Sequence, residues 1–492
     1  MSRISLEELE SYLWSSAVLL RTHIDAGAYK QYIFPLLFFK RICDVYDEEC
    51  AQILKEYGEE ALAWEEYHRF IVPEGHHWKD VRSVSSNVGV AIVHALQAIE
   101  KANTEKLHGV FGNAAWTNKN RLPDTLLKDL IEHFSSKTLS IANCPEDELG
   151  QGYEYLIKKF ADDSGHTAQE FYTNRTVVHL MTEILKPKSG ESVYDPTCGS
   201  AGMLISCVSH LQKLGQEWRN VKLYGQEITQ LTAAIGKMNL FLHGIKDFKI
   251  VNDDTLKNPA FTERGELKTF DVVLANPPYS IKQWDRAAFE NDKWGRNILG
   301  TPPQGRADYA FFQHIIKSMD KKTGRCAILF PHGVLFRQEE KDLRENLVKM
   351  DILECIIGLG PNLFYNSPME ACIVICKMKK EPEKAGKVLF INAVNDVARK
   401  NAQSYLEDEH IKKITSAYEN YRDVEGFAKV ASIKDIATNN YSLSIPLYAR
   451  EQQTEDKVEE LSLANSCSTW QTSSKEMRNC YNTLTSMLSK EA

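Results

Sequence analysis

Apolar residues recur at helical spacing through the first part of the chain. Segments such as SLEELESYLWSSAVLL and QYIFPLLFFKRICDVYDEECAQIL place them at i, i+3 and i+4, and strand-like runs between Gly or Pro are scarce. The pattern predicts an all-helical N-terminal domain over residues 1–150. A further amphipathic stretch, ELGQGYEYLIKKFADD, leads into a polar loop around residues 163–169.

From Ser192 onward, short apolar runs alternate with helical stretches. SVYDPT precedes AGMLISCVSHLQKL, VKLYGQE precedes LTAAIGKMNLFLH, and KIVNDD, FDVVLANPP and GRCAILFP follow, with DYAFFQHIIKSM as a helix before the last of these. Further strand-like runs are ILECIIGL, EACIVICKM and KVLFINA. This alternation predicts an α/β domain over residues 151–430, with a Rossmann-like parallel sheet and helices on both faces.

The end of the chain is polar, with one sparse apolar seam. Trp470, Met477 and Leu484 lie seven residues apart, and Cys480 and Met487 fall on the complementary line. This spacing favours a helix that pairs with another helix, either on a partner or on its own domain. We therefore expect residues 431–492 to form a C-terminal helical tail.

Composition and charge narrow the class of protein. The 492 residues are 43% hydrophobic and 26% charged, which excludes disorder as the dominant state. No apolar run reaches the ~18 residues of a membrane helix, and acidic residues interrupt the N-terminal run, so we expect no membrane association and a cytoplasmic protein. The 11 cysteines form neither a CxxC pair nor a Cys/His zinc pattern, so no metal site is expected. A net charge of −8 means that nucleic-acid binding would need local basic patches or a partner.

The first strand of the α/β region ends in a turn of small residues, DPTCGSAG (195–202), directly before a helix. Small residues at this position let the backbone approach a nucleotide closely. The turn opens with Asp195, which would repel pyrophosphate but suits an ammonium group.

Acidic residues also end the next two strands. Glu227 lies near the distance at which an acid binds ribose hydroxyls in doubly wound folds, and Asp253 or Asp254 could accept a hydrogen bond from an adenine amine. Each of this last pair, taken singly, is better explained as a turn or N-cap residue. Together the three strand ends predict a cofactor with a cation at one end and adenosine at the other, which is S-adenosyl-L-methionine.

The fourth strand delivers Asn276-Pro277-Pro278-Tyr279 at its C-terminal edge. An amine conjugated to a ring is a poor nucleophile, so an enzyme that methylates it should accept hydrogen bonds from both N–H groups. The side-chain oxygen of Asn276 and the carbonyl of Pro277 are two such acceptors. The prolines restrict φ and hold that carbonyl in place, and Tyr279 offers a stacking face to a base rotated out of a duplex. The alternative is a proline-rich turn after a strand.

These motifs resemble those of the modification (methylation) subunit of type I restriction-modification systems, an adenine-N6 DNA methyltransferase. DPTCGSAGML (195–204) resembles the family's first motif, NPPY (276–279) its catalytic motif, and EFYTNRTVVHLM (170–181) the cofactor-side segment that precedes the sheet. The resemblance covers nearly the whole chain.

The resemblance implies roles for individual residues. The implied cofactor-binding residues are Glu170, Phe171, Tyr172, Thr173, Asn174, Arg175, Asp195, Thr197, Gly199, Ser200, Ala201, Gly202, Glu227 and Asp254, with Tyr172 and Thr173 foremost in their segment. The implied catalytic residues are Asn276, Pro277, Pro278, Tyr279 and Phe364, of which Phe364 could equally be a core residue.

Three positions depart from the family pattern. Asn174 stands where proline is usual, Gln169 where glycine is common, and Ala201 where many members carry glycine. Asn174 loosens the geometry of its segment. Alanine at 201 fits the turn if its φ is negative.

The family also implies partners. We expect double-stranded DNA, a specificity subunit bound by two methylation subunits, and a restriction nuclease subunit, with the tail helix docking on the specificity subunit and the helical domain closing over DNA. The alternatives are a protein glutamine methyltransferase, a cytosine-N4 methyltransferase, or a non-catalytic clamp that binds cofactor and DNA.

Overall fold

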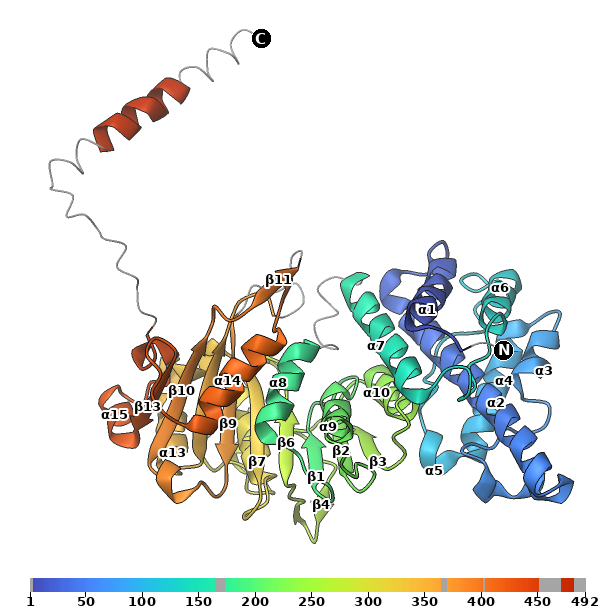
Figure 1. Cartoon of the computed structure of the whole chain (residues 1–492), viewed down its shortest axis with the longest axis horizontal. Helices are drawn as coiled ribbons and strands as arrows, with labels where there is room; N and C mark the ends of the chain where they lie inside the picture. Colours follow the sequence, from blue (N-terminus) through green and yellow to red (C-terminus); the bar gives the residue numbers. More distant parts are fainter. Residues whose placement is uncertain (1–2, 164–172, 364–369, 401–402, 451–469, 482–492) are drawn as a thin grey trace. The chain divides into compact units, whose positions relative to one another are not determined.

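The computed structural model describes residues 3–163, 173–363, 370–400, 403–450 and 470–481. The chain divides into two compact units, Met1–Ala449 and Arg450–Ala492, and each is described by itself (Figure 1). Residues 431–449, which the sequence analysis assigns to the tail, belong instead to the first unit, because Ile436, Leu443 and Ile445 are buried in its core.

The N-terminal region is helical, as the apolar spacing predicts. Its helices are α1 (Leu6–Leu20), α2 (Lys30–Glu56), α3 (Trp78–Ser83), α4 (Val88–Ala102), α5 (Thr104–Leu107), α6 (Asp124–Ser135) and α7 (Glu146–Asp163), with short 3-10 turns η1 (Ala26–Ala28), η2 (Glu59–Ala63) and η3 (Glu65–Tyr67). Helix α1 begins at a capping box between Ser5 and Glu8, which satisfies two backbone N–H groups at its start.

A nine-stranded sheet forms the centre of the α/β region (Figure 1). Its spatial order is β13-β10-β8-β9-β7-β6-β1-β2-β3. The strands are β1 (Ser192–Asp195), β2 (Lys222–Glu227), β3 (Phe248–Asn252), β6 (Val272–Ala275), β7 (Arg325–Pro331), β8 (Leu353–Leu359), β9 (Ala371–Lys377), β10 (Lys387–Ala393) and β13 (Ala428–Ser432). The eight strand-like runs of the sequence correspond to these strands except β13, which the sequence analysis does not predict.

The sheet is mixed rather than wholly parallel. Strand β9 runs antiparallel to β7 and β8. Strand β13 runs antiparallel to β10 and contains residue 430, the predicted end of the α/β domain. Two small hairpins, β4 (Thr262–Glu263) with β5 (Glu266–Leu267) and β11 (Ala398–Lys400) with β12 (Gln403–Tyr405), lie outside the sheet. Strand β9 follows β8 through a connection too short for a helical crossover, which favours the antiparallel arrangement.

Helices cover both faces of the sheet, as the predicted fold class requires. Helices α8 (Arg175–Leu185), α9 (Gly202–Lys213), α10 (Gln230–Leu242) and α14 (Asp408–Asn420) pack on one face, and α12 (Asp308–Lys317), α13 (Lys341–Lys349) and α15 (Ile433–Thr438) on the other. The connections hold α11 (Arg286–Glu290) and the 3-10 turns η5 (His332–Leu335), η6 (Gln338–Glu340), η7 (Pro382–Lys384) and η8 (Ile445–Leu447).

One helix belongs to both cores of the first unit. Ala234, Ile235, Met238 and Leu242 of α10 lie in the buried apolar cluster of the N-terminal helices, whereas Ala233 and Leu240 pack with the sheet. The hydroxyl of Tyr153 on α7 also donates to the carbonyl of Ile235 at 3.3 Å. The helical region is thus fastened to the α/β region through α10.

The second unit contains a helix over residues 470–481, as the seam of apolar residues predicts. Trp470 and Met477 are 71% and 72% exposed within the structure. Leu484 and Met487 lie outside the described residues. No helix in the described part of the chain has the length and apolar character needed to cross a membrane.

Candidate active site

The carboxyl ends of four parallel strands bring the predicted acids and the NPPY motif to one edge of the sheet. Strand β1 lies between β2 and β6, and β3 follows β2, all in parallel register. Asp195 and Glu227 end β1 and β2, and Asn276 follows the last residue of β6. The strand order reverses at β1, because β2 lies on one side of it and β6 on the other. Doubly wound folds bind ligands at the carboxyl edge of such a switch point.

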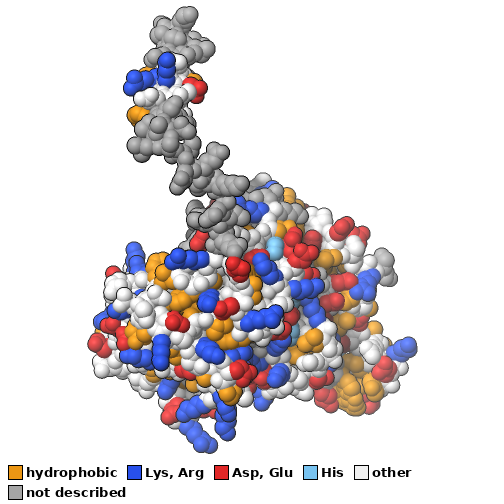
Figure 2. Space-filling model, turned by 60° about the vertical axis from the view of Figure 1, so that its left-hand side comes forward, with side chains coloured by type: hydrophobic (Ala, Val, Ile, Leu, Met, Phe, Trp, Pro, Cys, Tyr) orange, Lys and Arg blue, Asp and Glu red, His pale blue; other side chains and the backbone are white. Residues whose placement is uncertain are grey.

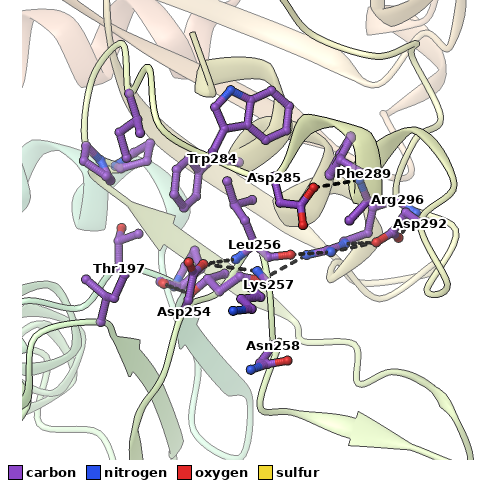
Figure 3. A pocket seen from close by; sticks show the side chains of 18 of the residues that line it. Thr197, Asp254, Leu256, Lys257, Asn258, Trp284, Asp285, Phe289, Asp292 and Arg296 are labelled. Carbon is purple, nitrogen blue, oxygen red and sulfur yellow. Dashed lines mark hydrogen bonds and ion pairs between the residues drawn. The ribbon is translucent and has the colours of Figure 1, made fainter. Parts of the chain in front are cut away.

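A cavity of 1170 Å³ opens at this edge. Seven predicted site residues line it, namely Thr197, Glu227, Asp254, Asn276, Pro277, Pro278 and Tyr279. Figure 3 shows Thr197 and Asp254 on one side and Asp285, Phe289 and Arg296 on the other. The volume exceeds the ~300–1,000 Å³ typical of small-molecule sites, so the cavity has room for more than a cofactor alone.

The small-residue turn after β1 is packed tightly against α10. A Cβ at Gly236 would lie 2.8 Å from the carbonyl oxygen of Gly199, so only glycine lets the helix approach this closely. Ala201 adopts a φ of 63°, and its N–H donates to the carbonyl of Cys198 at 2.7 Å. The condition of a negative φ at 201 is therefore not met, and alanine occupies a left-handed conformation at a cost of about 1–2 kcal/mol, held by this bond and by complete burial.

Glu227 connects this turn with the cavity. Its carboxylate accepts from the backbone N–H groups of Gly199 at 3.1 Å and Thr229 at 2.9 Å, and the residue also lines the cavity. The two backbone bonds fix the carboxylate at the end of β2, where it borders the cavity.

Asp195 is buried beside the cavity rather than among its lining residues. Its carboxylate accepts from the backbone N–H of Thr197 at 2.9 Å. Burial above all, together with the nearby carboxylate of Glu227, raises the pKa of Asp195 to about 7, despite the lowering effect of the Thr197 bond. A cation next to this buried group would stabilise its ionised form.

The structure separates the two candidates after β3. Asp254 lines the cavity and accepts from the backbone N–H groups of Leu256 at 2.8 Å and Lys257 at 3.1 Å. Asp253 accepts from the N–H of Asp254 and from the side chain of Asn258. Both thus act as turn residues, and Asp254 is the one placed at the cavity.

The side chain of Asn276 is held from two directions. Its Nδ2 donates to the hydroxyl of Thr173 at 3.0 Å, and its Oδ1 accepts from the hydroxyl of Tyr279 at 2.8 Å. These bonds fix the orientation of the amide, and Oδ1 retains a second acceptor position. Thr173, expected at the cofactor, is thus a direct partner of Asn276.

Asn174 and Arg175 have structural partners of their own. Asn174 caps α8 by accepting from the N–H of Thr176 at 3.0 Å, and it donates to the carbonyl of Ser404 at 3.1 Å. Arg175 pairs with Glu154 of α7 at 2.6 Å and lies over Gly202, where a Cβ would be 1.4 Å from its Nη1. The predicted residues Glu170, Phe171, Tyr172 and Phe364 lie outside the described residues.

Several cavity residues escaped prediction. Ile228, the residue after Glu227, lines the cavity, and its side chain is 65% exposed. Trp284 and Phe289, in the segment after NPPY, add aromatic surface to the lining. An isolated isoleucine after a strand gives no sequence signal, but the aromatic residues of KQWDRAAF in a polar segment could have indicated a binding surface.

The lining has the chemistry that S-adenosylmethionine requires. Carboxylates at Glu227 and Asp254 can accept from hydroxyl and amino groups, and the apolar side chain of Ile228 can contact a flat base. The small-residue turn at the end of β1 packs closely against α10, and the buried carboxylate of Asp195, which opens this turn, would suit a cation.

Comparison with known proteins supports one assignment. The family described as N-6 DNA Methylase matches residues 145–457, and the HsdM N-terminal domain matches residues 9–134. The chain belongs to the N-6 DNA methylase family. It is 33% identical to the type I restriction enzyme MjaVIII methylase subunit of Methanocaldococcus jannaschii over 93% of this chain and 81% of that protein. It is 30% identical to the HindI methylase subunit of Haemophilus influenzae over 75% of this chain and 85% of that protein.

Solved structures agree. The type I restriction-modification methyltransferase subunit of Streptococcus thermophilus superposes with a TM-score of 0.80 at 29% identity, over 91% of this chain and all of that one. This N-6 DNA methylase is therefore a type I methylation subunit, a DNA adenine-N6 methyltransferase that uses S-adenosylmethionine, and it works with DNA and the other subunits of a restriction-modification complex.

Proposed function

We propose that Asn276 and Pro277 hold the amino group of a flipped adenine at the edge of the cavity, and that Glu227 and Asp254 hold the adenosine part of the cofactor. The observation that carries this proposal is the constrained side chain of Asn276, which lines the cavity with its amide held by Thr173 and Tyr279. S-adenosylmethionine supplies an electrophilic methyl group.

The protein's part in the reaction is to prepare the amino nitrogen. The Asn276 Oδ1 and the Pro277 carbonyl oxygen accept its two N–H groups, which withdraws its lone pair from the ring and directs it at the incoming methyl. Because the amide is held before the base arrives, little reorganisation is needed at the moment of transfer. Pro278 completes the rigid turn, and Tyr279 contributes both its bond to Asn276 and an aromatic surface for the base.

Replacing Asn276 tests these roles. In the complex with its specificity subunit, Asn276→Ala should lower single-turnover transfer of labelled methyl to unmethylated genomic DNA by about 100-fold or more, as expected on removing a preorganised polar group. Cofactor binding, measured by calorimetry, should change little. Wild-type transfer by Asn276→Ala would favour the clamp alternative, and label on protein or on cytosine would contradict an adenine substrate.

We further propose that two of these subunits bind one specificity subunit, with the 470–481 helix docking on it, and that a nuclease subunit joins for restriction. The net charge of −8 supports the need for a partner in DNA binding. Figure 2 shows acidic and basic side chains interspersed over the displayed face. The mass of the co-expressed complex tests the 2:1 ratio. The cytoplasm, where bacterial and archaeal DNA lies, is the proposed location.

A further inference from the structure

The segment after the NPPY motif is anchored by a buried carboxylate. Asp308, the first residue of α12, is fully buried, and its Oδ1 accepts from the backbone N–H of Ser280 at 2.8 Å. Ser280 comes directly after Tyr279 and has a φ of 53°, a conformation that serine rarely adopts. The Asp308 carboxylate thus stabilises a strained turn next to the catalytic motif.

The same carboxylate is held from the other side by an arginine. Nη1 of Arg337 donates to Asp308 Oδ2 at 2.9 Å. Arg337 lies between η5 and η6, in the connection that follows β7, the strand next to β6 in the sheet. Because both carboxylate oxygens are engaged, Asp308 joins the loop after β6, the start of α12 and the segment after β7.

Arg337 is itself fixed by its surroundings. Its carbonyl accepts from Nη1 of buried Arg344 at 2.7 Å, and its side chain lies over Gly333, where a Cβ would be 2.4 Å from its Nε. The position of the guanidinium is therefore set by packing on the scaffold rather than by the loop. The scaffold in turn determines where the Ser280 N–H, and with it Tyr279, can lie.

We infer that Asp308, supported by Arg337, is a positioning residue that fixes the turn after NPPY, so that the Pro277 carbonyl and Tyr279 face the reacting amino group. Neither residue lines the cavity, so the effect is exerted through Ser280. Phe311, one turn further along α12, does line it, so the helix that anchors the loop also forms part of the wall. This inference rests on the proposed function.

The test compares four variants in the complex with its specificity subunit. Asp308→Ala removes both contacts, whereas Asp308→Asn keeps an oxygen that can accept from Ser280. Arg337→Gln removes the charge that supports Asp308, and it also removes the partner of Glu340, which lies 3.5 Å from the guanidinium. Glu339→Gln is the matched control, because Glu339 is an exposed acid of the same segment whose ion-pair partner is Arg306 rather than Arg337. Methyl transfer from labelled S-adenosylmethionine to unmethylated genomic DNA gives kcat and KM, calorimetry gives the cofactor Kd, and circular dichroism reports folding.

We expect Asp308→Ala to lower kcat by about tenfold or more, with the cofactor Kd within about twofold of wild type. Asp308→Asn should recover most of that loss, and Glu339→Gln should match wild type. If Asp308→Ala does not fold, Arg337→Gln decides, with an expected fall in kcat of about threefold.

Three results would overturn the inference: wild-type kcat in folded Asp308→Ala, equal losses in the alanine and asparagine variants, or loss of cofactor binding in parallel with rate. Asn276→Ala, measured alongside, distinguishes failure of the proposed function from failure of the positioning role. If Asn276→Ala keeps full activity, the proposed function fails. If only the Asp308 and Arg337 variants keep full activity, the proposed function stands and the positioning role fails.

Discussion

In the proposed reaction, the chemistry of the site depends on a single side chain, that of Asn276. Its two hydrogen-bond partners come from separate parts of the chain. Thr173 precedes the sheet, whereas Tyr279 belongs to the same loop as Asn276. The amide is held with its oxygen next to Tyr279 and its nitrogen next to Thr173. If the proposed function holds, the activity depends on the orientation of this one amide group.

Thr173→Val tests that orientation. Valine keeps the shape of the side chain but removes the acceptor of the Asn276 Nδ2 group, leaving a partly buried amide N–H without its bond. Losing one such bond costs about 1 kcal/mol, so we expect kcat to fall about fivefold. Thr173→Ser keeps the hydroxyl and should match wild type. Steady-state methyl transfer measures both, and equal rates in the two variants would contradict the orienting role.

Glu340, the last residue of η6, lies in an environment that disfavours its ionised form. Glu340 is fully buried, and burial raises the pKa of its carboxyl to about 7 although Arg337 lies 3.5 Å away and lowers it. In the unfolded chain the same group titrates near 4.5. The folded state therefore binds the proton more tightly, and the free energy of unfolding falls as pH rises from about 4.5 to 7.

Glu340→Gln should remove this pH dependence. Glutamine stays neutral, so we expect the variant to melt at a higher temperature than wild type at pH 8, where wild type has an ionised buried carboxylate, and at nearly the same temperature at pH 5. Thermal melts at the two pH values measure the difference. A stabilisation of equal size at both would show that titration of Glu340 is not its cause.

The helices and strands of the α/β region follow closely from the sequence. The eight apolar runs all became sheet strands, and the turn and the NPPY motif fell at strand ends because alternation with helices implies parallel strands with a common carboxyl edge. The direction of β9 was missed, since a buried strand reads the same in either direction. The Thr173–Asn276 and Ser280–Asp308 contacts span 103 and 28 residues and have no local signal.

For the first unit as a whole, the decisive feature is the shared helix α10. Met238 is fully buried in the apolar cluster of the N-terminal helices, while Gly236 of the same helix packs against Gly199 in the small-residue turn after β1. The aromatic ring of Phe241 also packs against Phe38 and Phe70 of the helical region, at 5.9 and 5.2 Å between centroids. The helical region and the α/β region are thus expected to unfold together.

Met238→Ala tests this coupling. Removing a buried methionine side chain should lower the free energy of unfolding by about 2–5 kcal/mol. Because the helix belongs to both cores, calorimetry of the variant should show one transition at a lower temperature, without a separate melt of the helical region. Exposed Lys257→Ala, at the cavity rim and away from this interface, is the control for stability. Two resolved transitions in the wild-type first unit would contradict the shared core.

A structure of the complex with target DNA and the cofactor analogue sinefungin would show whether Asn276 and Pro277 bind the amino group of the target adenine. The account predicts a flipped adenine whose N6 lies within about 3.2 Å of both the Asn276 Oδ1 and the Pro277 carbonyl oxygen. An adenine amino group beyond hydrogen-bond reach of both acceptors, or an Asn276 amide turned out of the cavity, would contradict it.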